Sequence, residues 1–152
     1  MAHKLAFIGF GTVGQGLAEI LLKKQHVVRQ EMGEDVKVVA ISDAIKGSVY
    51  NSDGLNLALI LDVVKRTGSL EDYPDDRGTE KGWDSLKTIE ETNADTIVEV
   101  TFTNVRTGQP AIDHCRAALG AGKNVVTSNK GPAALQYASR RSAARTLASR
   151  AR

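Results

Sequence analysis

The sequence predicts an α/β fold, an open parallel sheet with helices on both of its faces. The first observation is that four short, nearly continuous apolar runs are spread along the 152 residues, as in strands buried on both faces. The second is that stretches with apolar residues at spacings of three and four separate these runs, as in amphipathic helices. The third is length, because about 100–200 residues form one domain with its own core. Elements alternating in this way build parallel sheets through right-handed crossovers.

The first half of the chain is expected to hold two strands and two helices. Residues 4–9 (Lys-Leu-Ala-Phe-Ile-Gly) are an apolar run that ends in glycine, which predicts the first strand. Residues 12–29 are expected to form a helix because their apolar side chains recur at helical spacing: Val13, Leu17, Ile20, Leu21 and Val28. Residues 36–43 are mostly apolar and close in a polar turn, which predicts the second strand. A further helix is expected over residues 55–66.

The second half is expected to hold a short helix, two strands and a longer helix. A polar stretch that contains glycine, aspartate and proline, residues 67–82, leads into the short helix over 83–92. The remaining expected elements are a strand over 96–101, a helix over 110–119 that ends at Gly120 or Gly122, and a strand over 124–127. Pro132 stands where another helix could begin, because proline is tolerated in a first turn.

The turn between the first strand and the first helix carries a glycine pattern. Residues 9–14, Gly-Phe-Gly-Thr-Val-Gly, fit G-x-G-x-x-G in the strand–turn–helix setting of dinucleotide-binding loops. Gly9 permits the tight turn, Gly11 lets a pyrophosphate approach the backbone, and Gly14 lets the helix pack closely on the strand. The phosphates would lie at the helix N-terminus, against the backbone of Phe10, Thr12 and Val13. The alternative is a glycine-rich turn without a ligand.

Asp43 ends the second predicted strand, where an acid usually accepts hydrogen bonds from the adenosine ribose and selects NAD. Its distance from Gly14 is longer than the usual spacing of about 20 residues, which a longer first helix and loop would explain. The alternative is an aspartate that only stabilises a turn. Lys46 follows closely and could neutralise a 2′-phosphate, so the sequence leaves NAD and NADP both open as the cofactor.

Polar residues follow the two later strands, at the edge of a parallel sheet where ligands bind. These residues are expected to lie near the nicotinamide: Thr101, Thr103 and Asn104 after the third strand, and Ser128, Asn129 and Lys130 after the fourth. An ammonium beside a nicotinamide could hold a substrate oxygen or take part in proton transfer, which makes Lys130 the candidate catalytic residue. A solvated loop lysine is the alternative.

Five segments of the chain, in order, resemble the cofactor-binding domain of homoserine dehydrogenase. They lie within residues 9–17, 38–43, 47–55, 98–104 and 122–132, the last reading Gly-Lys-Asn-Val-Val-Thr-Ser-Asn-Lys-Gly-Pro, and the resemblance extends over about residues 4–138. It implies a Rossmann-type domain of an enzyme that interconverts L-aspartate 4-semialdehyde and L-homoserine with NAD(H) or NADP(H), on the route to threonine, methionine and isoleucine. It also implies that Lys130 contacts the nicotinamide end and the substrate site, and that Thr101 lines the cofactor cleft.

The sequence departs from this family after about residue 138. Family members continue with a substrate-binding and dimerisation domain, which is absent from the 152 residues. Residues 1–138 are therefore expected to be the NAD(P)-binding domain, with a sheet incomplete at its C-terminal side, of a truncated or frame-shifted chain. Such a chain would bind cofactor with little or no turnover, would need the missing domain to bind aspartate semialdehyde or homoserine, and has an unknown oligomeric state in a homodimeric family. Phe102 stands where members often carry a small residue or proline, and could narrow the nicotinamide pocket.

Residues 139–152 are rich in arginine, alanine and serine and are expected to be a tail outside the fold. The five arginines of this tail account for the formal net charge of +2, because the other 15 basic and 18 acidic residues give −3. A competing interpretation follows, a non-catalytic dinucleotide-binding module whose tail makes non-specific contacts with anions. No aromatic residue interleaves the arginines, so stacking on nucleic-acid bases is not indicated.

Cys115 is the only cysteine, which excludes an intrachain disulfide and a multi-cysteine zinc site. Neither Cys115 nor the neighbouring His114 has a partner at metal-ligand or catalytic spacing, so no metal site is expected; Cys115 is interpreted as a small buried group. A semialdehyde dehydrogenase with a cysteine nucleophile is disfavoured because Cys115 falls within a predicted helix. The sequence shows no signal-peptide pattern and no run long enough to span a membrane, which predicts a soluble, cytoplasmic protein.

Overall fold

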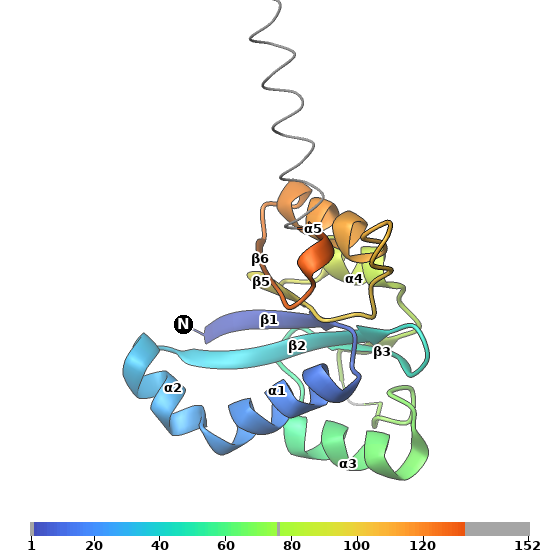
Figure 1. Ribbon diagram of the computed structural model, residues 1–152. Coiled ribbons are helices and arrows are strands. Elements are labelled where there is room, and N and C mark those ends of the chain that lie inside the picture. Colours follow the sequence, from blue (N-terminus) through green and yellow to red (C-terminus); the bar gives the residue numbers. More distant parts are fainter. Residues whose placement is uncertain (1, 76, 133–152) are drawn as a thin grey trace, which may run out of the picture.

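The computed structural model describes residues 2–75 and 77–132 (Figure 1). The predicted tail over 139–152 and the last residues of the predicted domain, 133–138, lie outside the described residues. The strands are β1 (Ala2–Ile8), β2 (Asp35–Asp43), β3 (Gly47–Asn51), β4 (Thr79–Lys81), β5 (Thr96–Glu99) and β6 (Asn124–Thr127). The helices are α1 (Thr12–Lys23), α2 (Gln25–Met32), α3 (Leu57–Thr67), α4 (Ser85–Glu91) and α5 (Ala111–Gly120).

The six strands of the described residues form one sheet in the order β4-β3-β2-β1-β5-β6. The four strands predicted from the sequence, β1, β2, β5 and β6, are all present and pair in parallel. β1 lies in the centre: its register pairs Lys4 with Lys37 of β2, and Leu5 with Thr96 of β5. The carboxyl ends of the parallel strands therefore meet at one edge of the sheet, as the site prediction requires.

The prediction of a wholly parallel sheet is wrong at one side. β3 pairs antiparallel with β2, and β4 pairs antiparallel with β3. Only three residues separate Asp43 from Gly47, and a connection this short can join antiparallel strands but not parallel ones. Gly47 has a φ of 84°, a conformation that favours glycine, and starts the returning strand.

Helices cover both faces of the sheet, as predicted (Figure 1). α1 and α3 contact each other on one face, and α4 and α5 contact each other on the other face. Alternate residues of β1 enter two separate cores: Phe7 packs with α1 and α3, whereas Ala6 and Ile8 pack on the opposite side, near Ile89 of α4. This arrangement is that of a sheet whose central strands are buried on both faces.

The helix predicted over residues 12–29 is two helices. Lys24 leaves the helical conformation, with φ −109° and ψ 17°, and separates α1 from α2. After this break, α2 contacts β2. No described helix has the length and apolar character that a membrane span requires.

Candidate functional site

The glycine loop has the geometry that its three glycines predict. Gly9 has a φ of 96°, and a Cβ on it would lie 2.8 Å from the backbone nitrogen of Thr101. A Cβ on Gly14 would lie 2.6 Å from the carbonyl oxygen of Gly9. A Cβ on Gly11 would meet nothing within 4 Å, so the space in front of α1 is open at that position. Two glycines thus serve close packing, and the third faces free space.

Among the described residues, no side chain caps the N-terminus of α1. Gly11 is its N-cap residue and has no side chain to accept a hydrogen bond, and the first turn contains no acid. The N–H groups of a first helical turn have no partner within the helix, and the helix dipole adds a partial positive charge there. An open, uncapped helix N-terminus beside a glycine turn is suited to a phosphate group.

Asp43 joins the end of β2 to the glycine loop. Its Oδ2 accepts a hydrogen bond from the Phe10 N–H at 2.7 Å, and its Oδ1 accepts from the Ile45 and Lys46 N–H groups, both at 3.0 Å. Burial alone would raise the pKa of Asp43, but these hydrogen bonds and the Lys46 charge lower it below the ordinary value. The carboxylate therefore stabilises its own turn; a ribose contact by the same oxygens stays a prediction.

Replacing Asp43 with alanine is expected to destabilise the glycine loop. The change removes the acceptor of three backbone N–H groups, including that of Phe10, whose side chain is fully buried. We expect a loss of about 1–3 kcal/mol in the free energy of unfolding, measured by urea denaturation at neutral pH. Asp53→Ala is the matched control, because that carboxylate is exposed and makes no hydrogen bond or ion pair within the described residues. Equal losses in the two variants would contradict the bridging role of Asp43.

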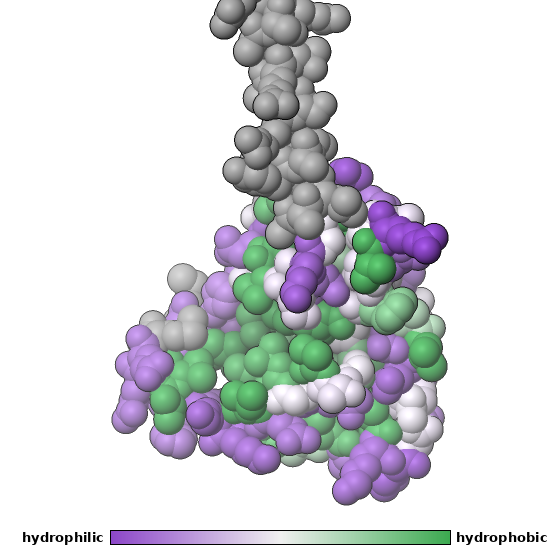
Figure 2. All heavy atoms as spheres, in the orientation of Figure 1, coloured by the Kyte–Doolittle hydropathy of each residue, from purple (hydrophilic) through white to green (hydrophobic). Residues whose placement is uncertain are grey.

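A hollow of about 410 Å³ lies where α1 faces the ends of β5 and β6. Its lining comes from these three elements: Thr12, Val13, Gly16, Leu17 and Ile20; Val98 and Val100; Val126, Thr127 and Ser128. Of the predicted site residues, Thr12, Val13 and Ser128 line it. Figure 2 shows a broad apolar area on this face of the molecule, and Val13, Ile20 and Val126 are each more than half exposed. The structure thus brings the glycine loop and β6 together around this hollow, which is called the cleft below.

The predicted residues after β5 differ in their surroundings. The Thr103 hydroxyl oxygen is buried without a hydrogen-bond partner among the described residues, as is the side-chain oxygen of Gln109. The Asn104 side-chain oxygen is engaged within its own loop, because it accepts from the N–H groups of Arg106 and Thr107. Phe102 is 91% exposed and does not line the hollow, and a narrowing of the nicotinamide pocket by its ring stays a prediction.

Lys130 is exposed and begins a helical turn that includes Gly131 and Pro132. A Cβ on Gly131 would lie 2.9 Å from the Cα of Gly108 and 3.4 Å from the Cγ2 of Thr103. This close approach brings Lys130 next to the loop after β5. The predicted site residues that follow β5 and those that follow β6 are therefore neighbours in space.

Glu99 is the residue of this region that the sequence prediction missed. It ends β5 with no part exposed, and its carboxylate accepts hydrogen bonds from side chains at the end of β6, Thr127 and Asn129, and from Thr101 in the loop after β5. Burial alone would raise its pKa, but hydrogen bonds from His114, Thr101, Asn129 and Thr127 outweigh burial and lower the pKa to about 2. The available signal was a lone charge in an otherwise apolar strand that was expected to be buried.

The two neighbours His114 and Cys115 are buried in α5, and Cys115 is a free thiol, as predicted. Burial and the nearby Glu99 charge raise the pKa of Cys115 to about 11, so it is not a reactive thiolate. Within residues 2–75 and 77–132, no three histidine, cysteine, aspartate or glutamate side chains come together as a metal site.

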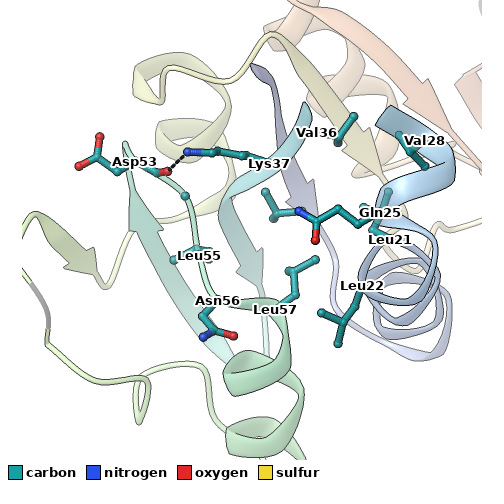
Figure 3. A pocket seen from close by; sticks show the side chains of 12 residues that line it. Leu21, Leu22, Gln25, Val28, Val36, Lys37, Asp53, Leu55, Asn56 and Leu57 are labelled. Atoms are coloured by element: carbon teal, nitrogen blue, oxygen red, sulfur yellow. Dashed lines mark hydrogen bonds between the residues drawn. The ribbon is translucent and has the colours of Figure 1, made fainter. Parts of the chain in front are cut away.

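A second cavity, of about 360 Å³, lies at the amino end of β2, away from the glycine loop (Figure 3). Leucine and valine side chains of α1, α2 and β2 form its walls, and Lys37 donates a hydrogen bond to the carbonyl of Asp53 on its rim. None of the predicted site residues lines this cavity.

The strands β2, β1, β5 and β6 run parallel, and a glycine turn and a helix N-terminus follow β1. Asp43 ends β2, and hydroxyl groups lie at the ends of β5 and β6. These features define a Rossmann-type dinucleotide-binding domain. Comparison with known proteins gives the family. The family model for Glutamate/Leucine/Phenylalanine/Valine dehydrogenase matches residues 2–130, and the chain belongs to this dehydrogenase family.

The relatives found over most of the chain confirm the resemblance to homoserine dehydrogenase. The chain is 40% identical to homoserine dehydrogenase of Methanocaldococcus jannaschii over 133 residues, which cover 88% of this chain and 38% of that protein. It is 38% identical over 143 residues to NAD(+)-dependent homoserine dehydrogenase of Pseudomonas canavaninivorans, covering 94% and 40%. A hyperthermophilic archaeal homoserine dehydrogenase mutant in complex with NADPH superimposes with a TM-score of 0.73 at 30% identity, covering 91% and 39%. The chain thus spans about two fifths of the length of these relatives.

Proposed function

We propose that this chain is the NAD(P)-binding part of a homoserine dehydrogenase. The observation that carries the proposal is the open space at Gly11, in front of the uncapped α1, in a cleft that the ends of β5 and β6 complete. A dinucleotide needs a phosphate site and a second half-site across the strand ends, and this cleft offers both.

The described residues fit such a cofactor. The segment Gly9–Gly14 would hold the pyrophosphate through backbone N–H groups, and Asp43 would face the adenosine ribose with its remaining lone pairs. Thr101, Thr103, Asn104, Ser128 and Lys130 would surround the nicotinamide end. When bound, the cofactor would supply hydride transfer.

The reaction proposed for the complete enzyme is the interconversion of L-aspartate 4-semialdehyde and L-homoserine. The names of the relatives support it, although they are more than twice as long as this chain. In this reaction Lys130 would bind the substrate oxygen or move a proton at it, because an ammonium can do both beside a nicotinamide. We also propose a cytoplasmic, homodimeric enzyme of threonine, methionine and isoleucine biosynthesis, in which residues 1–138 form the cofactor domain. The competing interpretation, a non-catalytic dinucleotide-binding module whose tail contacts anions, depends on residues 139–152, which lie outside the described residues.

The test is direct binding of NADH and NADPH to the full chain, followed by nucleotide fluorescence. Gly11→Ala is expected to weaken binding at least about tenfold, because its Cβ would occupy the space that the pyrophosphate needs. Gly120→Ala is the matched control: it also places a Cβ in open space, but at the end of α5. The control should bind like the unsubstituted chain, and both variants should be folded at the temperature of the binding assay, as checked by circular dichroism. Absence of binding to either nucleotide, or equal affinities for Gly11→Ala and Gly120→Ala, would overturn the proposal.

A further inference from the structure

Glu99 is the last residue of β5, at the edge of the sheet where the carboxyl ends of the parallel strands meet. In the register of the sheet it stands beside Ile8, the last residue before the glycine loop, on one side and beside Thr127 of β6 on the other. Its side chain is fully buried. A buried carboxylate is costly unless several donors satisfy it, so its presence at this point needs an explanation.

The donors to Glu99 come from three separate segments. Oε1 accepts from the backbone N–H of Thr101 at 3.2 Å and from the Thr101 hydroxyl. Oε2 accepts from the Thr127 hydroxyl at 2.8 Å and from the Asn129 amide nitrogen at 2.6 Å. His114 Nδ1 of α5 lies 3.5 Å from Oε1. One carboxylate therefore ties together the loop after β5, the loop after β6 and α5.

Asn129 connects the hydrogen bonds of Glu99 to Lys130, the next residue in the chain. Its amide nitrogen donates to Glu99 and also to the Thr101 carbonyl at 2.9 Å, so both amide hydrogens are used. Its backbone N–H donates to the Thr127 hydroxyl at 3.0 Å. Asn129 is thus held on both its side chain and its main chain, and the helical turn that starts at Lys130 leaves from this fixed point.

Only an ionised carboxylate satisfies this arrangement, because every group facing its two oxygens is a donor or can act as one. A glutamine of the same shape would turn an NH₂ group toward donors on one side or the other. We propose that Glu99 is a positioning residue that holds Thr101 and Asn129, and through Asn129 Lys130, in the arrangement that receives the nicotinamide end of the cofactor. This inference rests on the proposed function, and it assigns Glu99 no contact with the cofactor.

The experiment compares two ligands in Glu99→Gln, made in the full chain. ADP-ribose has the adenine, both riboses and the pyrophosphate of NADH but lacks the nicotinamide ring. We expect NADH binding to weaken at least about tenfold, as for the loss of a hydrogen bond to a charged group, while ADP-ribose binding changes less than about twofold. The fluorescence change of NADH on binding should also be reduced, because the ring loses its fixed surroundings. A role in folding alone would weaken both ligands equally.

Thr127→Val keeps the proposal testable if Glu99→Gln does not fold. Valine keeps the β-branched shape of Thr127 and leaves the Glu99 carboxylate in place, but it removes one donor to Oε2. We therefore expect NADH binding to weaken about threefold and ADP-ribose binding to stay unchanged. Thr96→Val is the matched control, since Thr96 is buried at the opposite end of β5 and its hydroxyl contacts only His3 among the described residues. The inference is wrong if Thr127→Val and Thr96→Val behave alike, or if Glu99→Gln weakens both ligands equally or neither. Failure of the unsubstituted chain to bind either ligand would instead overturn the proposed function, and this inference with it.

Discussion

Gly14→Ala is expected to destabilise the protein severely, although it adds only one methyl group. The new Cβ would lie 2.6 Å from the carbonyl oxygen of Gly9 and 3.3 Å from the ring of Phe10. The carbonyl belongs to the turn itself, and Gly9 is held by its N–H, which donates to the Ser42 carbonyl at 2.8 Å. Neither the Gly9 carbonyl nor the Phe10 ring can move away from the new Cβ without separating α1 from β1. We expect a loss of about 3 kcal/mol or more, a large part of the total stability of a domain of this size.

Gly16→Ala provides the contrast within the same helix. A Cβ on Gly16 would meet nothing within 4 Å, and alanine is a better helix former than glycine by about 1 kcal/mol. The same substitution two residues apart should therefore change the free energy of unfolding in opposite directions, as measured by urea denaturation followed by circular dichroism. Similar effects in the two variants would contradict the close packing of α1 on β1.

The second large effect is a loss of stability in acid that depends on Glu99. Its pKa of about 2 in the folded protein is below the ordinary value of 4.5. The folded state therefore favours the ionised carboxylate, and the resulting stabilisation is fully present above the ordinary pKa. It is lost as the pH falls toward about 2. The difference in pKa corresponds to a contribution on the order of 3 kcal/mol.

The measurement is the free energy of unfolding of the unsubstituted chain and of Glu99→Gln between about pH 6 and about pH 3. Glutamine does not titrate, so the difference between the two proteins should be largest near neutral pH and should shrink as the pH falls. Asp43, whose pKa is also lowered, is present in both proteins, and its effect cancels in the difference. A difference that stays constant over this range would show that Glu99 is not held as a carboxylate by its donors.

The strands with strong apolar runs could be predicted from the sequence, and the weak ones could not. β4 consists of Thr-Glu-Lys and forms only because β3 offers it an open edge. β3 is short, and its signal was Gly47 at a tight turn rather than an apolar run. The break between α1 and α2 has no glycine or proline to mark it; it reflects the contact of α2 with β2, which depends on tertiary structure.

The candidate site divides in the same way. The glycine loop is a local pattern, so its geometry at Gly9, Gly11 and Gly14 agrees with the prediction. The hydrogen bonds of Glu99 join residues up to 30 positions apart, and no local pattern encodes them. The acceptor role of Asp43 toward Phe10 likewise depends on bringing β2 beside β1. The particular contacts of each predicted residue with a cofactor stay predictions.

The central place of β1 has a consequence for the order of folding. Its first neighbour, β2, follows about 30 residues later in the sequence. Its second neighbour, β5, which pairs Thr96 with Leu5, follows about 90 residues later. During synthesis on the ribosome, the N-terminal strand, its two helices and the β2–β3 hairpin can assemble as soon as they emerge. The edge of β1 that pairs with β5 then stays unpaired until β5 has been synthesised. Pairing β1 with β5 closes a loop of about 90 residues, which is slow. We therefore expect the growing chain to be most exposed to misassembly and to chaperones in the interval between the translation of β2 and that of β5.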